Sequence, residues 1–466
     1  FPAPKPSAVQ EVAVEEVQPE AAEAPSVSNE ASGAGETAGT PSAPILAVTE
    51  DIREQTITEE TDLFLITFSN RGGVITSLKL KEHPDGEDFV DMVNAGTSGE
   101  GAFAMKFGGI AAPDIDQPFE YKQTGEFTYE FSRVFLAPSR GGEAPVPFLL
   151  KKTYVFQPDE YLMELRVTIE NSVKEYPNLS SGGYAYTLVS GPQIGPVFKQ
   201  LDQRREYRHY TVLVDGKPKT IKVAKTDNTV VDQRVTWAAI VGKYFALVGI
   251  PDQTPYKIGF STIPIEGAPE TSTLYFSRPP IKSSKNTDVF RFYLGPKIPR
   301  DLTRYNDSKD NGFGLTDYNL DDVIESGKLL GWLENILKWM LQMAYKVVPN
   351  YGVAIILLTI FIKLITFPIN QKGSKSTAKM KALGPRMEEL KAKYQSNPQK
   401  LNEEMAALYK KEGVNPMGGC LPLLIQFPIF IALYGVLNKH FELRGAMFIP
   451  GWITDLSQPE SIWNFA

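Results

Sequence analysis

Short runs of β-branched and aromatic residues dominate the chain from about residue 45 to residue 300, and Gly, Pro, Asn and Asp separate them. Leu63–Phe68 and Val74–Leu80 are two such runs, and the turn-forming sequence Ser69–Gly73 joins them, which predicts a β-hairpin. Apolar stripes with a helical period are scarce in this region. The pattern therefore predicts one large antiparallel sandwich over residues 45–300. Four later runs are predicted as further strands: Lys152–Phe156, Leu162–Ile169, Val235–Ile250 and Val289–Leu294.

A helical period begins after residue 328. Between Leu330 and Val348 polar residues recur at every fourth position and apolar residues cover the rest, which predicts an amphipathic helix over residues 329–349. Its Trp332, Trp339 and Tyr345 suit the boundary between water and lipid, so the preferred interpretation is an interfacial helix in the membrane plane. A helix docked in a soluble core is the alternative.

Two longer apolar stretches follow. Tyr351–Ile369 contains a single charged residue, Lys363, and Cys420–Leu437 contains none. At about 1.5 Å per residue, each stretch is long enough to cross the hydrocarbon layer. They predict transmembrane helices at residues 350–369 and 418–441, with residues 442–466 leaving the second span.

The loop between the two spans, residues 370–415, has ten basic residues and five acidic ones, in a chain whose net charge is −7. The positive-inside rule places this loop in the cytoplasm and the β domain outside. Gly384-Pro385 separates two helical stripes, and Asn397-Pro398 suits the start of the second, so the loop is predicted to form a helical hairpin. Its charged face either contacts a ribosome or signal-recognition machinery, or is simply solvated. The candidate contact residues are Lys379, Lys381, Arg386, Lys391 and Lys393.

The remaining segments are polar. Residues 1–44 are rich in Ala, Pro, Glu, Ser and Gly, and they predict a disordered acidic tether because they cannot bury enough surface to fold. The chain begins at Phe1 instead of Met, so a segment upstream is expected to have been removed. Residues 301–328 are rich in Asp and Asn and are predicted to be a linker.

The composition of the chain argues against several classes of binding site. Cys420 is the single cysteine and the three histidines are far apart in the sequence, so neither a disulfide nor a metal site is expected. The chain is not globally basic, so direct reading of nucleic acid is not expected. No GxxxxGK[ST] sequence occurs, and no cofactor is predicted.

Several sequences resemble the YidC/Oxa family of membrane protein insertases, in particular its bacterial YidC-type members. The most specific is NPMGGCLPLLIQFPIFIALYGVL, which is preceded by KMKALGPRMEELKAKY and followed by WITDLS. The strings FSNRGGVITSLKL, WAAIVGKYFALVGIP and FYLGPK also resemble the large periplasmic domain of that family. The resemblance spans residues 45–466.

The resemblance implies a periplasmic β-supersandwich, an inner-membrane location, and a hydrophilic groove that is open to lipid and receives nascent membrane proteins. It also implies the Sec translocon and the ribosome as partners. The family carries a functional positive residue, usually arginine, in the first of these spans, and the matching residue here is Lys363. Thr359 lies one turn before it, and Gln426 is the conspicuous polar residue of the second span. Lys363 either lines such a groove or snorkels to the cytoplasmic headgroups.

The predicted function is therefore that of a membrane protein insertase and chaperone without catalytic chemistry. The alternative is a membrane-anchored periplasmic protein that binds or modifies carbohydrate, because large β-sandwiches often bind sugars. The candidate residues for a sugar site are Trp237, Tyr244, Arg204, Arg205, Arg208 and His209, each of which also suits a core or a solvated surface.

Overall fold

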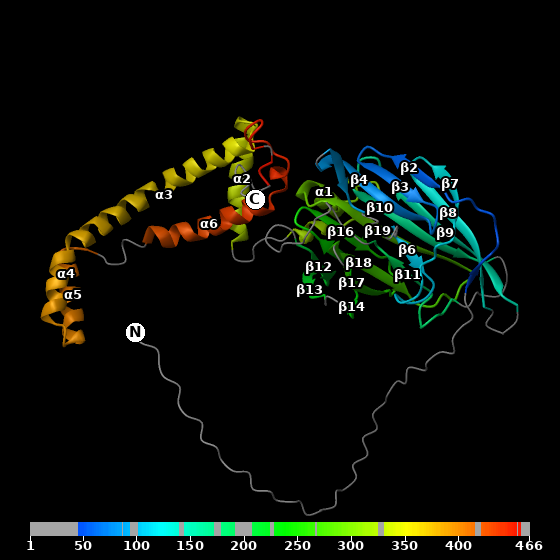
Figure 1. Cartoon of the computed structure of the whole chain (residues 1–466), viewed down its shortest axis with the longest axis horizontal. Coiled ribbons are helices and arrows are strands. Elements are labelled where there is room, and N and C mark those ends of the chain that lie inside the picture. Colours follow the sequence, from blue (N-terminus) through cyan, green and yellow to red (C-terminus); the bar gives the residue numbers. More distant parts are fainter. Residues whose placement is uncertain are drawn as a thin grey trace, which may run out of the picture. The chain divides into compact units, whose positions relative to one another are not determined.

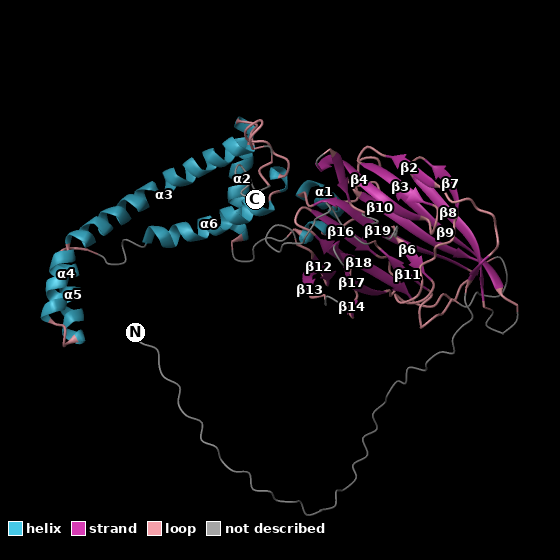
Figure 2. Cartoon of the chain, viewed as in Figure 1, coloured by secondary structure: helices cyan, strands magenta, loops and turns pink. Residues whose placement is uncertain are grey.

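The structure, a computed structural model of the chain, describes residues 45–85, 87–93, 101–138, 144–171, 179–191, 207–223, 228–265, 268–324, 330–414, 421–453 and 455–457 (Figure 1). The tether predicted for residues 1–44 lies outside these ranges. Strands come first in the chain and long helices follow (Figure 2). This order confirms the predicted fold class, a large antiparallel β domain followed by a helical region.

The largest sheet of the β domain has ten antiparallel strands. In spatial order they are β1 (Leu46–Ala47), β8 (Thr128–Ala137), β9 (Val146–Phe156), β10 (Leu162–Glu170), β19 (Lys285–Pro296), β16 (Phe245–Ile250), β15 (Trp237–Val241), β12 (His209–Val214) and β13 (Lys217–Ile221), with β7 (Glu120–Gly125) also paired to β8.

Two smaller antiparallel sheets complete the domain. The five-stranded sheet contains β14 (Asn228–Val231), β17 (Lys257–Ile265), β18 (Ala268–Arg278), β11 (Tyr186–Val189) and β6 (Ala104–Lys106). The four-stranded sheet contains β2 (Thr56–Glu60), β3 (Phe64–Ser69), β4 (Val74–Asp85) and β5 (Asp88–Asp91). All six of the runs predicted as strands from the sequence fall on strands of these sheets, and the run Val235–Ile250 contains two of them, β15 and β16.

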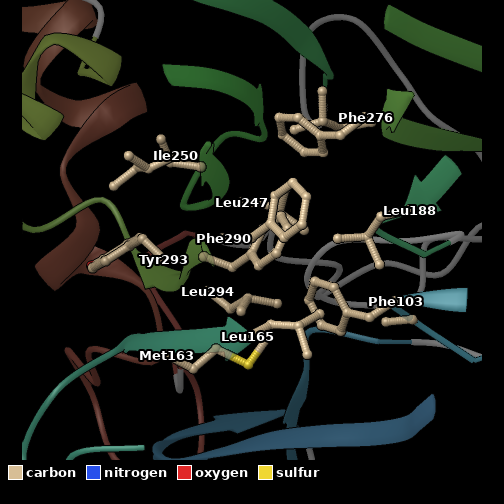
Figure 3. Packing of buried hydrophobic residues seen from close by; sticks show 14 of the residues in the cluster. Phe103, Met163, Leu165, Leu188, Leu247, Ile250, Phe276, Phe290, Tyr293 and Leu294 are labelled. Carbon is tan, nitrogen blue, oxygen red and sulfur yellow. The ribbon is translucent and has the colours of Figure 1, made fainter. Parts of the chain in front are cut away.

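One continuous apolar core joins the three sheets. Strands such as β8 bury every second residue, as expected for a sheet with one face in the core. The Phe276 ring of the five-stranded sheet lies 5.5 Å from the Phe290 ring of the ten-stranded sheet (Figure 3). The Phe103 ring lies 4.6 Å from the Phe292 ring. The sheets are therefore held together mainly by contacts between large apolar side chains.

The hairpin between β3 and β4 needs its two glycines. Gly72 and Gly73 both have positive φ angles, 71° and 55°. A Cβ atom on Gly73 would lie 2.9 Å from the Cβ of Phe131, and one on Gly72 would lie 2.6 Å from the carbonyl oxygen of Ile115. Glycine is the residue that tolerates this backbone and leaves room for these neighbours.

Lys152 is an unusual core residue, because its side chain is fully buried between the sheets. Its ammonium group donates hydrogen bonds to the carbonyl oxygens of Gly72, at 3.0 Å, and Phe103, at 2.7 Å. Burial lowers the pKa of Lys152 to about 7, since a desolvated ammonium is costly. The lysine thereby links β9 to the β3–β4 turn and to the segment before β6.

Residues 301–324 are not the linker that the sequence predicted. They include the end of the short helix α1 (Pro299–Thr303) and the two 3-10 helices η1 (Arg304–Asn306) and η2 (Leu320–Val323). This segment belongs to the β domain. Five of their apolar side chains are buried in the common core: Leu302, Tyr305, Leu315, Leu320 and Val323. The indole of Trp237 donates to the carbonyl oxygen of Tyr318 at 2.9 Å. The segment is polar on average, so its composition did not reveal that its widely spaced apolar residues belong to the core.

Truncation at residue 300 is therefore expected to destabilise the β domain severely. Each buried apolar side chain that is lost contributes roughly 1.5–3 kcal/mol, and a whole domain is stable by only about 5–15 kcal/mol. We expect residues 45–324 to give a soluble, β-rich protein with a cooperative thermal transition, and residues 45–300 to aggregate or melt far lower. Circular dichroism of both fragments measures this, and equal melting temperatures would contradict the extended boundary.

The helical region contains five longer helices and one short one among its described residues. They are α2 (Gly331–Val347), α3 (Tyr351–Ala382), α4 (Gly384–Lys393), α5 (Pro398–Lys411), α6 (Leu421–Lys439) and η4 (Phe441–Leu443). The first predicted span was expected to end at Ile369. Helix α3 contains Pro368 without ending there, and it continues to Ala382. The apolar stretch ends where expected. The helix itself continues because Lys, Ala, Met and Gln in the following residues are good helix formers.

The chain after α6 returns to the β domain. Phe441 packs edge-on against His83, 5.1 Å between centroids, and against Phe245, at 5.5 Å. The guanidinium of Arg444 donates to the carbonyl oxygen of Pro84 at 3.0 Å. Burial, with a smaller contribution from Arg444, lowers the pKa of His83 to about 4. His83 is therefore neutral at physiological pH, as its apolar contacts require.

Candidate functional site

Helices α2, α3 and α6 pack around a small apolar cluster of their own. Its buried members are Leu337, Leu341, Ala354, Leu358, Ala432 and Val436. The narrow face of α2 that carries Leu337 and Leu341 contacts the two longer helices, while Trp332 and Trp339 are 65% and 62% exposed. Tyr345, the third predicted anchor, stacks on Tyr351 with the ring centroids 4.0 Å apart. Helix α2 is thus docked on one face and presents two indoles on its surface.

Both predicted spans form helices that are long and apolar enough to cross a membrane. Most of their large apolar side chains are exposed, among them Leu364 on α3 and Leu423 on α6. The core helix of a soluble protein buries such side chains. Their exposure on these two helices fits a lipid surrounding instead.

Five polar residues of α3 are spaced by three, four or seven positions and therefore lie on one side of the helix. We call them the polar stripe: Thr359, Lys363, Thr366, Asn370 and Thr377. The hydroxyls of Thr359 and Thr366 donate to the carbonyl oxygens of Ile355, at 2.8 Å, and Ile362, at 2.9 Å. Both hydroxyls therefore have hydrogen-bond partners within their own helix. They can lie in the apolar part of the membrane without a partner from a second helix.

Lys363 is exposed between Thr359 and Thr366 on this stripe. In the described part of the chain no carboxylate forms an ion pair with its ammonium group. Thr359 shares its side of the helix, as the spacing predicted. Gln426 is half-buried on α6, and among the described residues no hydrogen bond connects it to Lys363 or Thr359. The structure therefore brings two of the three predicted groove residues together.

Sequence reasoning did not follow the spacing beyond Lys363, so it missed Thr366, which lies within the predicted span, and Asn370, which lies directly after it. Thr366 is buried, and the amide of Asn370 donates to its hydroxyl at 3.5 Å. The signal was available, because the spacing that connects Thr359 to Lys363 continues to both residues. A search for polar residues at intervals of three and four through the end of the apolar stretch would have found them.

Helices α4 and α5 form the predicted hairpin. The side chain of Asn397 accepts from the backbone amide of Lys400 at 3.1 Å, so it caps α5 as expected. The two helices are joined by an ion pair of Arg386 with Glu412, at 2.7 Å, and by the hydroxyl of Tyr409, which lies 3.7 Å from the sulfur of Met387.

The five candidate contact residues are all exposed, but they lie on two helices. Lys379 and Lys381 end α3, whereas Arg386, Lys391 and Lys393 belong to α4. Because Arg386 is paired with Glu412, the lysines carry the unneutralised positive charge of this set.

The described residues that were suggested for a sugar site do not form one. Trp237 is completely buried in the core, and Tyr244 packs against Phe441 at 6.0 Å. Arg208 and His209 are half-buried near and on β12. Arg204 and Arg205 lie outside the described residues. An indole in the middle of a ten-stranded sheet cannot provide a platform for a ligand.

Comparison with known sequences decides the family. Residues 56–342 match the family described as the YidC periplasmic domain, and residues 343–466 match the family described as 60Kd inner membrane protein. A "Membrane protein insertase YidC" from Treponema denticola is 39% identical over 421 residues, which cover 89% of this chain and 72% of that protein. The chain belongs to the YidC family of membrane protein insertases. A relative of the same name from Treponema pallidum is 36% identical over 455 residues, with the same coverage of both chains.

Solved structures give weaker likenesses. An active YidC insertase with its first transmembrane domain resolved is 18% identical, with a TM-score of 0.30, over 89% of this chain and 78% of that one. A galactose mutarotase-like protein from Lactobacillus casei is 11% identical, with a TM-score of 0.38, over 52% of this chain and 100% of that one. Neither likeness is close enough to indicate a function.

Membership of the YidC family confirms the resemblance that the sequence motifs carried. The family is one of inner-membrane insertases with a periplasmic domain, so the β domain is that periplasmic domain and α3 and α6 belong to the membrane region. The residues of the polar stripe lie within this membrane region or at its end.

Proposed function

We propose that this YidC-family protein inserts hydrophobic segments into the inner membrane by receiving them along the polar stripe of α3. The observation that carries the proposal is Lys363, an exposed ammonium group on a helix whose other exposed side chains nearby are mostly apolar. A lysine at the centre of a span costs roughly 2.5–3.5 kcal/mol on insertion scales. A water-filled groove that uses the charge is the better account of its position.

The energy for insertion would come from the substrate. Each Leu or Ile of an incoming segment gains about 0.3–0.6 kcal/mol at the bilayer centre, so about twenty apolar residues offset one or two charged ones. The protein then acts on the rate. A wet groove along Thr359 and Lys363 shortens the apolar distance that the substrate's polar tail must cross, and the positive charge attracts acidic groups in that tail.

Snorkelling is the competing account of Lys363. The residue lies about 18 Å along the helix from Tyr351, beyond the middle of the apolar stretch, so its flexible side chain can reach toward the cytoplasmic headgroups. The threonines at positions 359 and 366 favour the groove, because snorkelling of a single lysine does not require polar neighbours one turn away on both sides.

Site-specific crosslinking tests the groove directly. A photoreactive residue at Thr359 is expected to capture a single-span substrate during insertion several-fold more strongly than the same residue at Ile360. The two positions have nearly the same depth, and both are exposed, but they lie about 100° apart around the helix. Equal capture at both positions would indicate that the substrate passes through lipid without a preferred face of α3.

The proposed topology places residues 370–415 in the cytoplasm, and residues 1–349 and 442–466 outside, because the loop between the spans has five excess positive charges. In a background with Cys420 replaced, we expect a cysteine at Lys391 to resist an impermeant thiol reagent until the cells are lysed. A cysteine at exposed Lys309 of the β domain is the control and should label once the reagent reaches the periplasm. Labelling at position 391 before lysis would reverse the orientation.

The ribosome and the Sec translocon are proposed partners, by family resemblance. Lys391 and Lys393 on α4, with Lys379 and Lys381 on α3, give the ribosome's RNA a basic surface that is not neutralised by Glu412. Binding through phosphate contacts should weaken steeply with salt. Ribosome co-sedimentation that is unchanged when Lys391 and Lys393 are replaced by Glu would exclude this surface. Copurification in mild detergent tests the Sec translocon.

The proposed anchors of α2 are Trp332 and Trp339. Both indoles are largely exposed, so an outer-leaflet interface could meet them, and Trp339 also lines an apolar hollow with residues of α3. Tyr345 contributes by fixing the α2–α3 corner through Tyr351 instead of by direct exposure.

A further inference from the structure

Charged side chains of both signs line a hollow of about 100 Å³ where α2 and the end of α6 meet the β domain. The residues that matter here are Glu334 and Lys338 of α2, Lys439 of α6, His440 and Glu442 after α6, and Lys297 of the β domain. We call this space the mixed-charge hollow. A single ordered water needs about 10–15 Å³, so the hollow admits a group of several non-hydrogen atoms.

One nitrogen of a buried imidazole in this lining has no partner. His440 is 4% exposed, and its Nδ1 lies 2.6 Å from a carboxylate oxygen of Glu442. The ring packs edge-on against Tyr351, with the centroids 5.9 Å apart. The other nitrogen, Nε2, has no hydrogen-bond partner among the described residues. A buried polar atom without a partner is costly, so a polar group in the hollow is expected to supply one.

The two charged residues of α2 present opposite signs to the hollow, one helical turn apart. Side chains at this spacing have Cβ atoms about 5–6 Å apart. Within the described residues no ion pair joins Glu334 to Lys338. The Glu334 carboxylate lies against α6, so closely that a Cβ on Gly435 would be 2.6 Å from its Oε1. Glu442 is already paired with His440. Glu334 can therefore accept an ammonium group while Lys338 and His440 hold a phosphate.

The side chains of α6 next to the hollow indicate where the rest of such a molecule would lie. Ile431 and Tyr434 are 45% and 68% exposed, and they come directly before the residues of α6 that line the hollow. Because α6 belongs to the membrane region, acyl chains are the surrounding that suits these apolar side chains. A headgroup attached to acyl chains therefore fits this position better than a free solute does.

We propose that the mixed-charge hollow binds the phosphoethanolamine headgroup of a membrane phospholipid. The ammonium and the phosphate of this headgroup are joined by two carbon atoms, so they match the neighbouring opposite charges of α2. A protonated imidazole donates through both of its nitrogens, so a phosphate oxygen satisfies Nε2 of His440. A phosphatidylglycerol headgroup lacks the ammonium and would leave the Glu334 carboxylate facing a second negative charge. The site depends on the membrane location of α6 and not on insertion along the polar stripe.

Native mass spectrometry of the whole protein in mild detergent tests this site. Phosphatidylethanolamine is expected to bind about fivefold more tightly than phosphatidylglycerol with the same acyl chains. Glu334→Gln should remove this preference, because the ammonium loses its partner. Lys338→Ala should weaken the binding of both lipids about threefold. Lys346→Ala is the matched control and should change neither, because Lys346 is exposed two turns further along α2 and does not line the hollow.

His440→Asn tests the buried imidazole. The amide nitrogen of Asn can replace Nδ1 toward Glu442, while nothing replaces Nε2, so the binding of both lipids should weaken about fivefold. Equal affinity of the unmodified protein for the two lipids would overturn the proposal, and so would unchanged binding by folded Glu334→Gln and His440→Asn variants. Free phosphoethanolamine that binds as tightly as the lipid would exclude a lipid site. These measurements need no insertion activity, so their failure would leave the proposed function standing.

Discussion

Replacement of Lys363 by Ala is expected to reduce membrane protein insertion about tenfold or more for substrates with acidic tails, while Lys363→Arg retains it. Electrostatic attraction into a polar site of low dielectric changes association rates by roughly 10–10³. Arg keeps the charge, although its planar fork has a different hydrogen-bonding geometry. Lys363→Glu should be worse than Lys363→Ala, because it repels the same acidic groups. Substrates with neutral tails should show a smaller contrast.

Complementation in cells depleted of their native insertase measures this effect. Each variant must be quantified in membranes, so that loss of folding is separated from loss of function. Lys375→Ala is the matched control, because Lys375 is exposed on the same helix beyond the apolar stretch. Snorkelling predicts the opposite result for position 363, since removal of an intramembrane charge would then be neutral or stabilising. Full activity of a normally expressed Lys363→Ala variant would therefore reject the role of this residue.

The free energy of unfolding of the β domain is expected to rise between pH 7 and pH 9.5 because of Lys152. The pKa of this lysine is about 7 in the folded domain and 10.5 when it is exposed to water. Between these values the unfolded chain binds a proton that the folded domain does not, so stability increases with pH by up to roughly 1.4 kcal/mol per pH unit. The penalty is fully present below pH 7. The total gain to pH 9.5 is about 3 kcal/mol.

Urea unfolding of residues 45–324 at several pH values measures this slope, with Lys152→Met as the variant that should remove it. Met is similar in length and fills the same space without a titrating group. The pH range must stop below 10, because burial raises the pKa of core tyrosines such as Tyr154 and reverses the trend once unfolded tyrosines ionise. Parallel pH profiles for the two proteins would show that Lys152 does not titrate as its burial requires.

Much of the β domain was predictable because runs of β-branched and aromatic residues alternate with turn-forming residues along the chain. The run Leu162–Ile169, for example, contains the β-branched residues that favour strands. In the structure it forms β10, which pairs with β9 on one side and β19 on the other. The boundary at residue 300 was not predictable in the same way. Leu302, Leu315 and Leu320 are widely spaced in a polar segment, and only the folded chain shows that they share one core.

The candidate site was predictable in its position but not in its extent. The apolar stretch identified α3, and one charge within it identified Lys363. Composition could not show that the helix continues to Ala382, since the end of an apolar stretch marks the end of the hydrocarbon layer and not the end of a helix. The sugar hypothesis failed at Trp237, because an aromatic residue in a strand has the same local sequence whether it faces solvent or the core.

Reconstitution of the protein into liposomes tests the central proposal most directly. A small single-span substrate with an acidic tail is synthesised in the presence of the vesicles, and its translocated tail is scored by protection from added protease. We expect protection that depends on the protein, needs no nucleotide hydrolysis by the protein itself, and falls strongly with Lys363→Ala but not with Lys375→Ala. Protection that is equal in protein-free liposomes, or that is unchanged by Lys363→Ala at matched protein levels, would contradict insertion along the polar stripe.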